Sequence, residues 1–204
     1  MIAFDYIDMD AFSARYHTPN PTKSQIKAFK VDCEDLAKAS NTDNEEYQKN
    51  AIKDLLQKTF GYICNVKDRI DLCIYEEGVA KVIIEVKALN NKTEFPKSPS
   101  NPLSKAFCQS VFYFLKEHIQ NKNNEIKHII ICNPLSFFIF DASEFIKLSS
   151  DTTIKKIFSN TTDGTDKSTD RFYKDIQSHL KSDEFDKSIK YTYFALGRGG
   201  GIPK

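Results

Sequence analysis

Helical periodicity is clearest in three stretches of this sequence. Residues 24–39, 45–60 and 103–120 each repeat their apolar side chains every three or four positions, as one face of an amphipathic helix requires. The polar residues at 41–44 offer N-cap candidates for the second stretch, and Gly61 follows its last turn. This helix therefore has predicted limits at both ends.

Short apolar segments between these helices predict β-strands. They are residues 62–66, 70–75, 80–88, 128–132 and 137–140. The turn at 76–78 joins the second strand to the third, which predicts an antiparallel meander. The last two strands are apolar on both faces around a turn at 133–136, which is typical of strands that helices cover on both sides.

This order of elements predicts an α/β fold, a three-layer sandwich in which helices flank a mixed central sheet. We expect an N-terminal arm and leading helix at 1–43, with the arm irregular up to that helix, and the core domain at 44–149. The polar segment 150–196 is predicted to be a helical connector, with one helix near 169–181. The end, residues 197–204, has no helical or strand pattern and is expected to be disordered.

Charge and cysteine content narrow the classes of protein. The 29 basic residues nearly cancel the 28 acidic ones, so a site for a polyanion must be a local patch. The five cysteines have no Cys-x-x-Cys spacing, which predicts buried free thiols in a reducing cytoplasm. No run of about 18 apolar residues and no basic N-terminal signal occurs, so we expect a cytoplasmic protein with no membrane partner.

The hairpin RIDLCIYEEGVAKVIIEVKA, residues 69–88, carries charges where an apolar strand would have valine or isoleucine. Side chains two apart on a strand share a face, so Glu85 and Lys87 point the same way. Pairing around the turn brings Asp71 opposite residue 84 or 85. The carboxylates of Asp71 and Glu85 are then close enough to hold one cation.

Two hard oxygen ligands that leave most of the coordination shell open suit Mg²⁺, with Mn²⁺ as a substitute. Beside such a metal, the Lys87 ammonium can stabilise an activated hydroxide or the charge of a pentacovalent phosphorane. The alternative is that Asp71, Glu85 and Lys87 form salt bridges on an exposed sheet face. Both strands are otherwise apolar, so burying three charges on them costs desolvation free energy. Because such a cost needs a purpose, we favour a functional role for these residues.

A motif with these residues resembles that of a known family. Ile70-Asp71, then thirteen residues, then Glu85-Val86-Lys87 resemble the PD-(D/E)xK nucleases, whose core is a helix, a three-stranded meander, a helix and further strands. Ile70 replaces the proline of the motif, which removes no ligand. The resemblance implies a restriction-endonuclease-like fold.

Two helices carry further matches to these nucleases. Glu46 matches an additional acidic residue that many of them use to reach the metal through water. Gln109 and Tyr113 match a Gln-x-x-x-Tyr spacing found in some members, and at i, i+4 both would face the site. An ordinary half-buried helix face explains these last two residues equally well.

A closer resemblance covers residues 44–145 and continues weakly through DRFYKDI and YTYFAL. Segments such as EEYQKNAIKDLL, VIIEVKALNNKTE and NEIKHIIICNPLSFFIFDASEF look like the N-terminal nuclease region of single-chain, type IIG-like restriction-modification enzymes. This implies double-stranded DNA as substrate and restriction as biological role. It also suggests methyltransferase or specificity regions, or a separate subunit, as partners, and it leaves a homodimer open.

The sequence departs from that family at its end. An Asn-Pro-Pro-Tyr box and a glycine-rich cofactor loop are both missing, so the methyltransferase region is absent. The ending GRGGGIPK has four glycines in five residues, which predicts a truncated chain read in a wrong frame. A natural flexible tail is the alternative.

The loop after the hairpin is the best local basic patch. Lys92, Lys97 and Lys105 are predicted to contact DNA phosphates, with Tyr113 near the same site. A solvated linker is the competing interpretation of this loop.

The sequence therefore predicts a Mg²⁺-dependent DNA endonuclease. Asp71 and Glu85 are the predicted metal ligands, Lys87 is the partner of the water or transition state, and Glu46 and Gln109 support them. Two alternatives stay open, a catalytically silent DNA-binding or subunit-docking module of the same fold and a DNA-repair nuclease.

Overall fold

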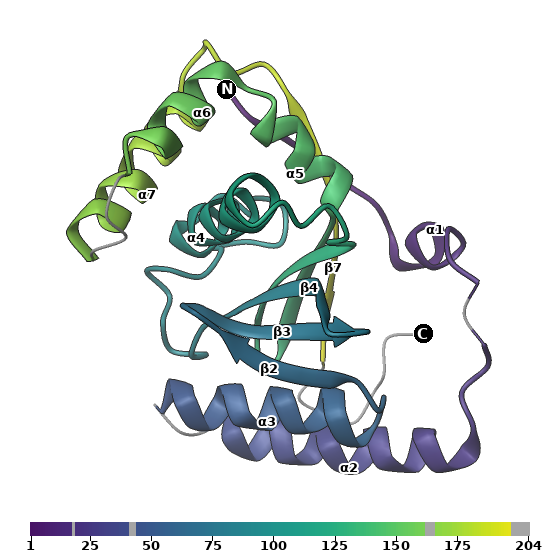
Figure 1. Cartoon of the computed structure of the whole chain (residues 1–204). Coiled ribbons are helices and arrows are strands. Elements are labelled where there is room, and N and C mark those ends of the chain that lie inside the picture. Colours follow the sequence, from purple (N-terminus) through teal and green to yellow (C-terminus); the bar gives the residue numbers. More distant parts are fainter. Residues whose placement is uncertain (18, 41–43, 162–165, 197–204) are drawn as a thin grey trace.

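Seven strands form one mixed β-sheet in the order β1-β7-β6-β5-β4-β3-β2 (Figure 1). This computed structural model describes residues 1–17, 19–40, 44–161 and 166–196. The strands are β1 (Ala3–Tyr6), β2 (Ile63–Lys67), β3 (Ile70–Glu76), β4 (Val79–Val86), β5 (His128–Asn133), β6 (Ser136–Asp141) and β7 (Ser188–Ala195). The pairs β1–β7 and β4–β5 are parallel, and the other neighbouring pairs are antiparallel.

Helices cover both faces of the sheet. Two of them, α2 (Lys23–Ala39) and α3 (Glu45–Lys58), lie on one face, where Leu36 and Ile52 join a core with strand residues such as Ile84. The other face is covered by α4 (Lys105–Leu115), its π-helical extension η1 (Lys116–Gln120), α5 (Ala142–Ser149), α6 (Thr152–Ser159) and α7 (Asp166–Lys181). The short helix α1 (Met9–Ser13) precedes α2. The predicted α/β sandwich with a mixed central sheet is confirmed.

The β3–β4 hairpin turns through only two residues. Glu76 pairs with Val79, so Glu77 and Gly78 form the turn, with φ of 52° and 79°. Positive φ at both positions is typical of a type I′ turn, and glycine adopts it without strain. This tight turn, together with an irregularity between Ile74 and Tyr75, sets the register in which Leu72 lies opposite Ile84.

Both ends of the described chain contribute strands that the sequence prediction missed. The arm predicted to be irregular contains β1 and α1, and β1 pairs with β7. The segment 150–196, predicted to be a helical connector, contains α6 and α7 but ends in β7, a strand inside the sheet. A four-residue strand is too short to show periodicity, whereas β7 alternates polar and apolar residues from Ser188 to Tyr193, a strand pattern that the prediction of a helical connector did not take into account.

Part of the N-cap cluster and the whole glycine-rich end, residues 197–204, lie outside the described residues. Asn44 is described, and its side chain caps α3 by accepting a hydrogen bond from the Tyr47 backbone N–H at 3.0 Å. All five cysteines are free thiols, and all except Cys33 are buried. Within the described ranges, no helix has both the length and the apolar character that crossing a membrane needs.

Substituting Ile189 of β7 tests whether this strand belongs to the cooperative core. Its side chain is 0% exposed, so Ile189→Ala should lower the free energy of unfolding by about 2–5 kcal/mol. The matched control is Ile63→Ala in β2, where the side chain is 61% exposed and the expected change is within about 0.5 kcal/mol. Urea unfolding followed by circular dichroism measures both, and equal effects would contradict the place of β7 in the core.

Candidate active site

The β3–β4 hairpin brings Asp71 and Glu85 together on the sheet face that α4 covers. Leu72 pairs with Ile84, so the next positions along the two strands, Asp71 and Glu85, also lie opposite each other. Asp71 Oδ2 accepts a hydrogen bond from the Val86 backbone N–H at 2.9 Å. The predicted register of the two carboxylates is therefore the observed one.

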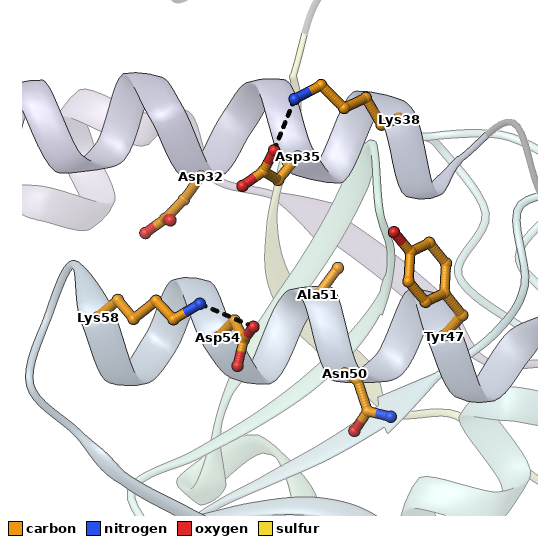
Figure 2. Close-up of a pocket in the computed structure, with 8 residues that line it drawn as sticks. All are labelled: Asp32, Asp35, Lys38, Tyr47, Asn50, Ala51, Asp54 and Lys58. Atoms are coloured by element: carbon orange, nitrogen blue, oxygen red, sulfur yellow. Dashed lines mark hydrogen bonds and ion pairs between the residues drawn. The ribbon is translucent and has the colours of Figure 1, made fainter.

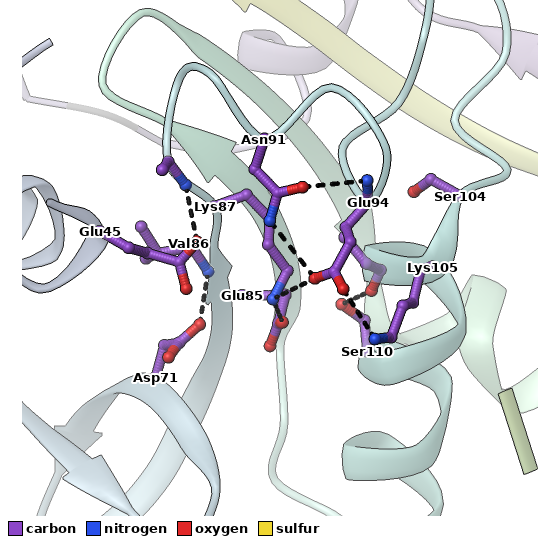
Figure 3. A network of polar contacts seen from close by, with 12 residues as sticks. Glu45, Asp71, Glu85, Val86, Lys87, Asn91, Glu94, Ser104, Lys105 and Ser110 are labelled. Atoms are coloured by element: carbon purple, nitrogen blue, oxygen red, sulfur yellow. Dashed lines mark hydrogen bonds and ion pairs between the residues drawn. The ribbon is translucent and has the colours of Figure 1, made fainter. Parts of the chain in front are cut away.

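Lys87 follows directly after β4 and joins the same group (Figure 3). Its Nζ lies 2.6 Å from Glu85 Oε1 and 3.5 Å from Glu94 Oε2. Glu85 is 1% exposed and Lys87 is 5% exposed, whereas the Asp71 side chain is 21% exposed. Glu85 and Lys87 are therefore buried, and Asp71 beside them is partly accessible to solvent. This is not a set of salt bridges on an open sheet face.

Burial also changes the protonation of this group. It raises the pKa of Glu85 to about 8, although the Lys87 ammonium opposes the shift. It raises the pKa of Asp71 as well, against the opposing effects of the Val86 N–H and of Lys87. Burial alone would lower the pKa of Lys87, but Glu85 and then Asp71 raise it above its ordinary value. Lys87 and Lys49, whose Nζ lies 3.8 Å from Asp71 Oδ1, only partly offset the cost of ionising the two carboxylates, and a bound cation would offset more of it.

Among the described side chains, two buried oxygen atoms have no hydrogen-bond partner, Glu85 Oε2 and Gln109 Oε1. An unpaired buried polar atom costs about 1–3 kcal/mol, and such atoms in folded proteins usually face a water or an ion. Glu85 thus uses one carboxylate oxygen for Lys87 and keeps the other available. Asp71 and Glu85 are oxygen donors of the kind that Mg²⁺ prefers.

The first turns of α3 hold the end of β4. Glu45 Oε2 accepts a hydrogen bond from the Ala88 backbone N–H at 2.9 Å, and Gln48 Oε1 accepts one from the Leu89 N–H at 2.8 Å. The predicted supporting acid, Glu46, instead pairs with Lys49 at 2.6 Å and its side chain is 65% exposed. Glu45 is therefore the acidic residue of α3 beside the site. The sequence could not separate two adjacent glutamates in a first helical turn.

The wall opposite α3 comes from α4 and α7. Tyr113 of α4 is 5% exposed, and burial together with the nearby Glu85 charge raises its pKa. Its hydroxyl forms a hydrogen bond with Tyr173 of α7, which in turn bonds Thr169. The Gln109 and Tyr113 predicted from spacing thus both lie on the buried side of α4. Tyr173 was missed because its helix was assigned to a connector.

The predicted DNA-contacting lysines have different environments. Lys105 forms ion pairs with two carboxylates: its Nζ lies 2.7 Å from Glu94 Oε1 and 3.7 Å from Asp170 Oδ1. Lys92 and Lys97 are exposed on the loop between β4 and α4. Lys92 and Lys97 are therefore available to solvent as the prediction requires, whereas the Lys105 side chain is 39% exposed but held by two carboxylates.

A separate cavity of about 260 Å³ lies between α2 and α3 (Figure 2). It contains three aspartates, and each already has a donor: Lys38 for Asp35 at 2.8 Å, Lys58 for Asp54 at 2.9 Å, and Thr59 Oγ1 for Asp32 at 2.5 Å. This cavity has no counterpart of the unpaired Glu85 oxygen among its described residues. We therefore regard the Asp71, Glu85 and Lys87 group as the stronger candidate.

Within the described part of the chain, His, Cys, Asp and Glu side chains do not gather in a group of three or more that could hold a metal ion. Any cation at this site would depend on Asp71 and Glu85 for its side-chain ligands, and on water or substrate for the rest.

Comparison with known proteins gives a family. Over residues 8–199 the sequence matches the family described as "Domain of unknown function (DUF7149)", and the chain belongs to that family. No curated protein and no solved structure matches this chain. The family description states no activity, so the functional argument depends on the geometry of the site.

Replacing Asp71 by asparagine tests the electrostatic description. In the folded protein the pKa of Asp71 lies above its unfolded value of about 3.9, so the folded state holds this proton more tightly. The contribution of Asp71 to the free energy of unfolding therefore falls as the pH rises above that value. The asparagine side chain can still accept the Val86 N–H without carrying a charge. Asp71→Asn should therefore raise the Tm in EDTA by a few degrees at pH 7 and by almost nothing near pH 4.

Thermal melts from pH 4 to pH 8 measure this difference. Asp35→Asn is the control, because Asp35 is exposed and its pKa is lowered by Lys38. It should give no gain at pH 7. A Tm gain for Asp71→Asn that does not change with pH would contradict the described burial of this charge.

Proposed function

We propose that this chain is a Mg²⁺-dependent DNA endonuclease domain of the PD-(D/E)xK type, with a restriction-endonuclease-like fold. The observation that carries the proposal is the unpaired, buried Glu85 Oε2 opposite Asp71, in a group that also contains the Lys87 ammonium. Two carboxylates and one lysine at the end of a strand hairpin are the side chains that this chemistry uses. The structural alternative, a solvated set of salt bridges, does not account for a carboxylate that is 1% exposed.

The architecture supports the same proposal. A helix, a three-stranded meander, a second helix and two further strands occur in the order α3, β2–β4, α4, β5–β6. This is the order of the nuclease core that the sequence motif resembles. The strands β4 and β5 are parallel, so α4 crosses over the sheet and closes one side of the site.

Each side chain has a role in this proposal. Asp71 and Glu85 would hold the metal, which on binding supplies a Lewis acid for a phosphate oxygen and an attacking water. Hydrolysis forms one bond from the water oxygen to phosphorus and breaks one ester P–O bond, with a proton delivered to the leaving oxygen. The Lys87 ammonium would stabilise negative charge that develops on the phosphate. Gln109, with an unpaired buried oxygen on α4, would help to orient the attacking water.

Double-stranded DNA is the substrate that we propose, in the context of restriction. Exposed Lys92 and Lys97 on the β4–α4 loop are available for phosphate contacts, which position a duplex without reading its sequence. A nuclease of this kind would bind with strong salt dependence and little sequence preference.

Cleavage of supercoiled plasmid is the direct test. The wild-type chain should nick or cut DNA with Mg²⁺ and not with EDTA, and Asp71→Asn, Glu85→Gln and Lys87→Gln should each lower the rate by about 100-fold or more. Asp35→Asn, in the cavity between α2 and α3, is the matched control and should keep the wild-type rate. Wild-type activity in any of the three site variants would refute the assigned roles.

Metal binding can be tested apart from cleavage. A ligand that binds only the folded state stabilises it, by about 2.7 kcal/mol at 100 times its Kd, so Mg²⁺ should raise the Tm of the wild-type chain. Asp71→Asn and Glu85→Gln should remove this shift, whereas Lys87→Gln should keep it. An equal shift in the Asp71 variant would exclude this carboxylate as a ligand, whatever the cleavage assay shows.

A further inference from the structure

We infer that Glu94 is a positioning residue that holds the Lys87 ammonium in place while a cation occupies the neighbouring carboxylates. This inference rests on the proposed function, because it assigns a task to Glu94 within the same site. It concerns a residue outside the nuclease motif, on the loop between β4 and α4.

The geometry places Lys87 between two carboxylates (Figure 3). Glu85 Oε1 lies 2.6 Å from Lys87 Nζ, and Glu94 Oε2 lies 3.5 Å from the same atom. The two acids come from different segments, Glu85 from β4 and Glu94 from the loop that follows it. Lys87 therefore has a second anionic partner, Glu94, which does not belong to the Asp71 and Glu85 pair that would hold the cation.

A bound cation would change the balance between these partners. Glu85 would then share its charge between the cation and Lys87, and two positive groups on one carboxylate repel each other. Without another partner, the flexible lysine side chain would move away from the cation. Glu94 supplies negative charge on the other side of the ammonium and opposes this movement.

Glu94 is itself fixed by several contacts. Its backbone N–H donates to Asn91 Oδ1 at 3.3 Å, and its carbonyl accepts from the Ala106 N–H at 3.0 Å. The Asn91 Nδ2 lies 3.5 Å from Glu94 Oε2, and Lys105 Nζ lies 2.7 Å from Oε1. The next residue, Phe95, packs edge-on against a core aromatic ring, Phe138, at 5.7 Å. These contacts keep the Glu94 carboxylate in place. It can therefore hold the Lys87 ammonium, because it does not move with the lysine side chain.

The charge state of Glu94 agrees with this task. Partial burial alone would raise its pKa, but the contacts with Lys105 and Lys87 lower it below the ordinary value. Glu94 is thus anionic at neutral pH. Lys105, predicted from sequence to contact DNA, instead helps to hold Glu94.

Glu94→Gln tests this inference in the full chain. The maximum single-turnover cleavage rate with Mg²⁺ should fall about 10- to 100-fold, because misplacing a group in the site costs rate. The DNA concentration for half-saturation and the Mg²⁺ affinity measured by calorimetry should stay within about twofold of wild type. Glu94→Asp, which keeps the charge on a shorter side chain, should recover part of the rate.

The Lys87 ammonium can also be observed directly. Buried, hydrogen-bonded lysine ammonium groups give ¹H–¹⁵N signals in NMR spectra, and the Lys87 signal is assigned by its loss in Lys87→Gln. With saturating Mg²⁺ this signal should persist in the wild type and weaken or vanish in Glu94→Gln. Glu125→Gln is the matched control, because Glu125 is 58% exposed and pairs with Lys81; it should change neither rate nor signal.

The outcomes separate this inference from the proposed function. A wild-type chain that neither binds Mg²⁺ nor cleaves DNA refutes the proposed function. An active wild type with an equally fast Glu94→Gln variant, or with an unchanged Lys87 signal in that variant, refutes only the inference. A tenfold or larger loss of Mg²⁺ affinity in Glu94→Gln also overturns it, because Glu94 would then be a metal ligand.

Discussion

The burial of the Glu85 carboxyl group beside the Lys87 ammonium is the constraint on which the rest of the structure depends. Each buried ion costs several kcal/mol of desolvation, and the pair offsets this cost only at close range, here 2.6 Å. The surroundings must therefore hold both side chains in one arrangement. The hairpin register, the α3 side chains that bind the backbone after β4, and the loop that carries Glu94 all contribute to that arrangement.

The two faces of the sheet differ in polarity around β4. On the α2–α3 face, Ile84 and Val86 pack into an apolar core and secure β4 without polar demands. On the α4 face, Ile83 continues the larger core, whereas Glu85 interrupts it beside Tyr113. A low-dielectric wall on that side strengthens every charge interaction in the site. The apolar core and the charged group thus use alternate residues of one strand.

The sequence was informative where periodicity or charge stood out from its surroundings. The hairpin was predictable because Asp71 and Glu85 interrupt apolar runs, and the long helices because their apolar residues recur regularly. Glu45 could not be distinguished from Glu46, since one residue of rotation on a helix decides which side chain meets the strand. Glu94 and Tyr173 carry no periodic signal for the site, because only the folding of a loop and a distant helix brings them there.

The pairing of β1 with β7 has a consequence for synthesis of the chain. Ala3 of β1 lies beside Ser188 of β7, so this edge of the sheet forms only after residue 188 has left the ribosome. The hairpin, α3 and α4 are complete long before that point, and their contacts are more local. Until β7 arrives, β6 presents an unpaired edge, which is a surface where nascent chains can associate wrongly. During synthesis, we therefore expect chaperones to bind the open edge of the sheet at β6 and not the charged site.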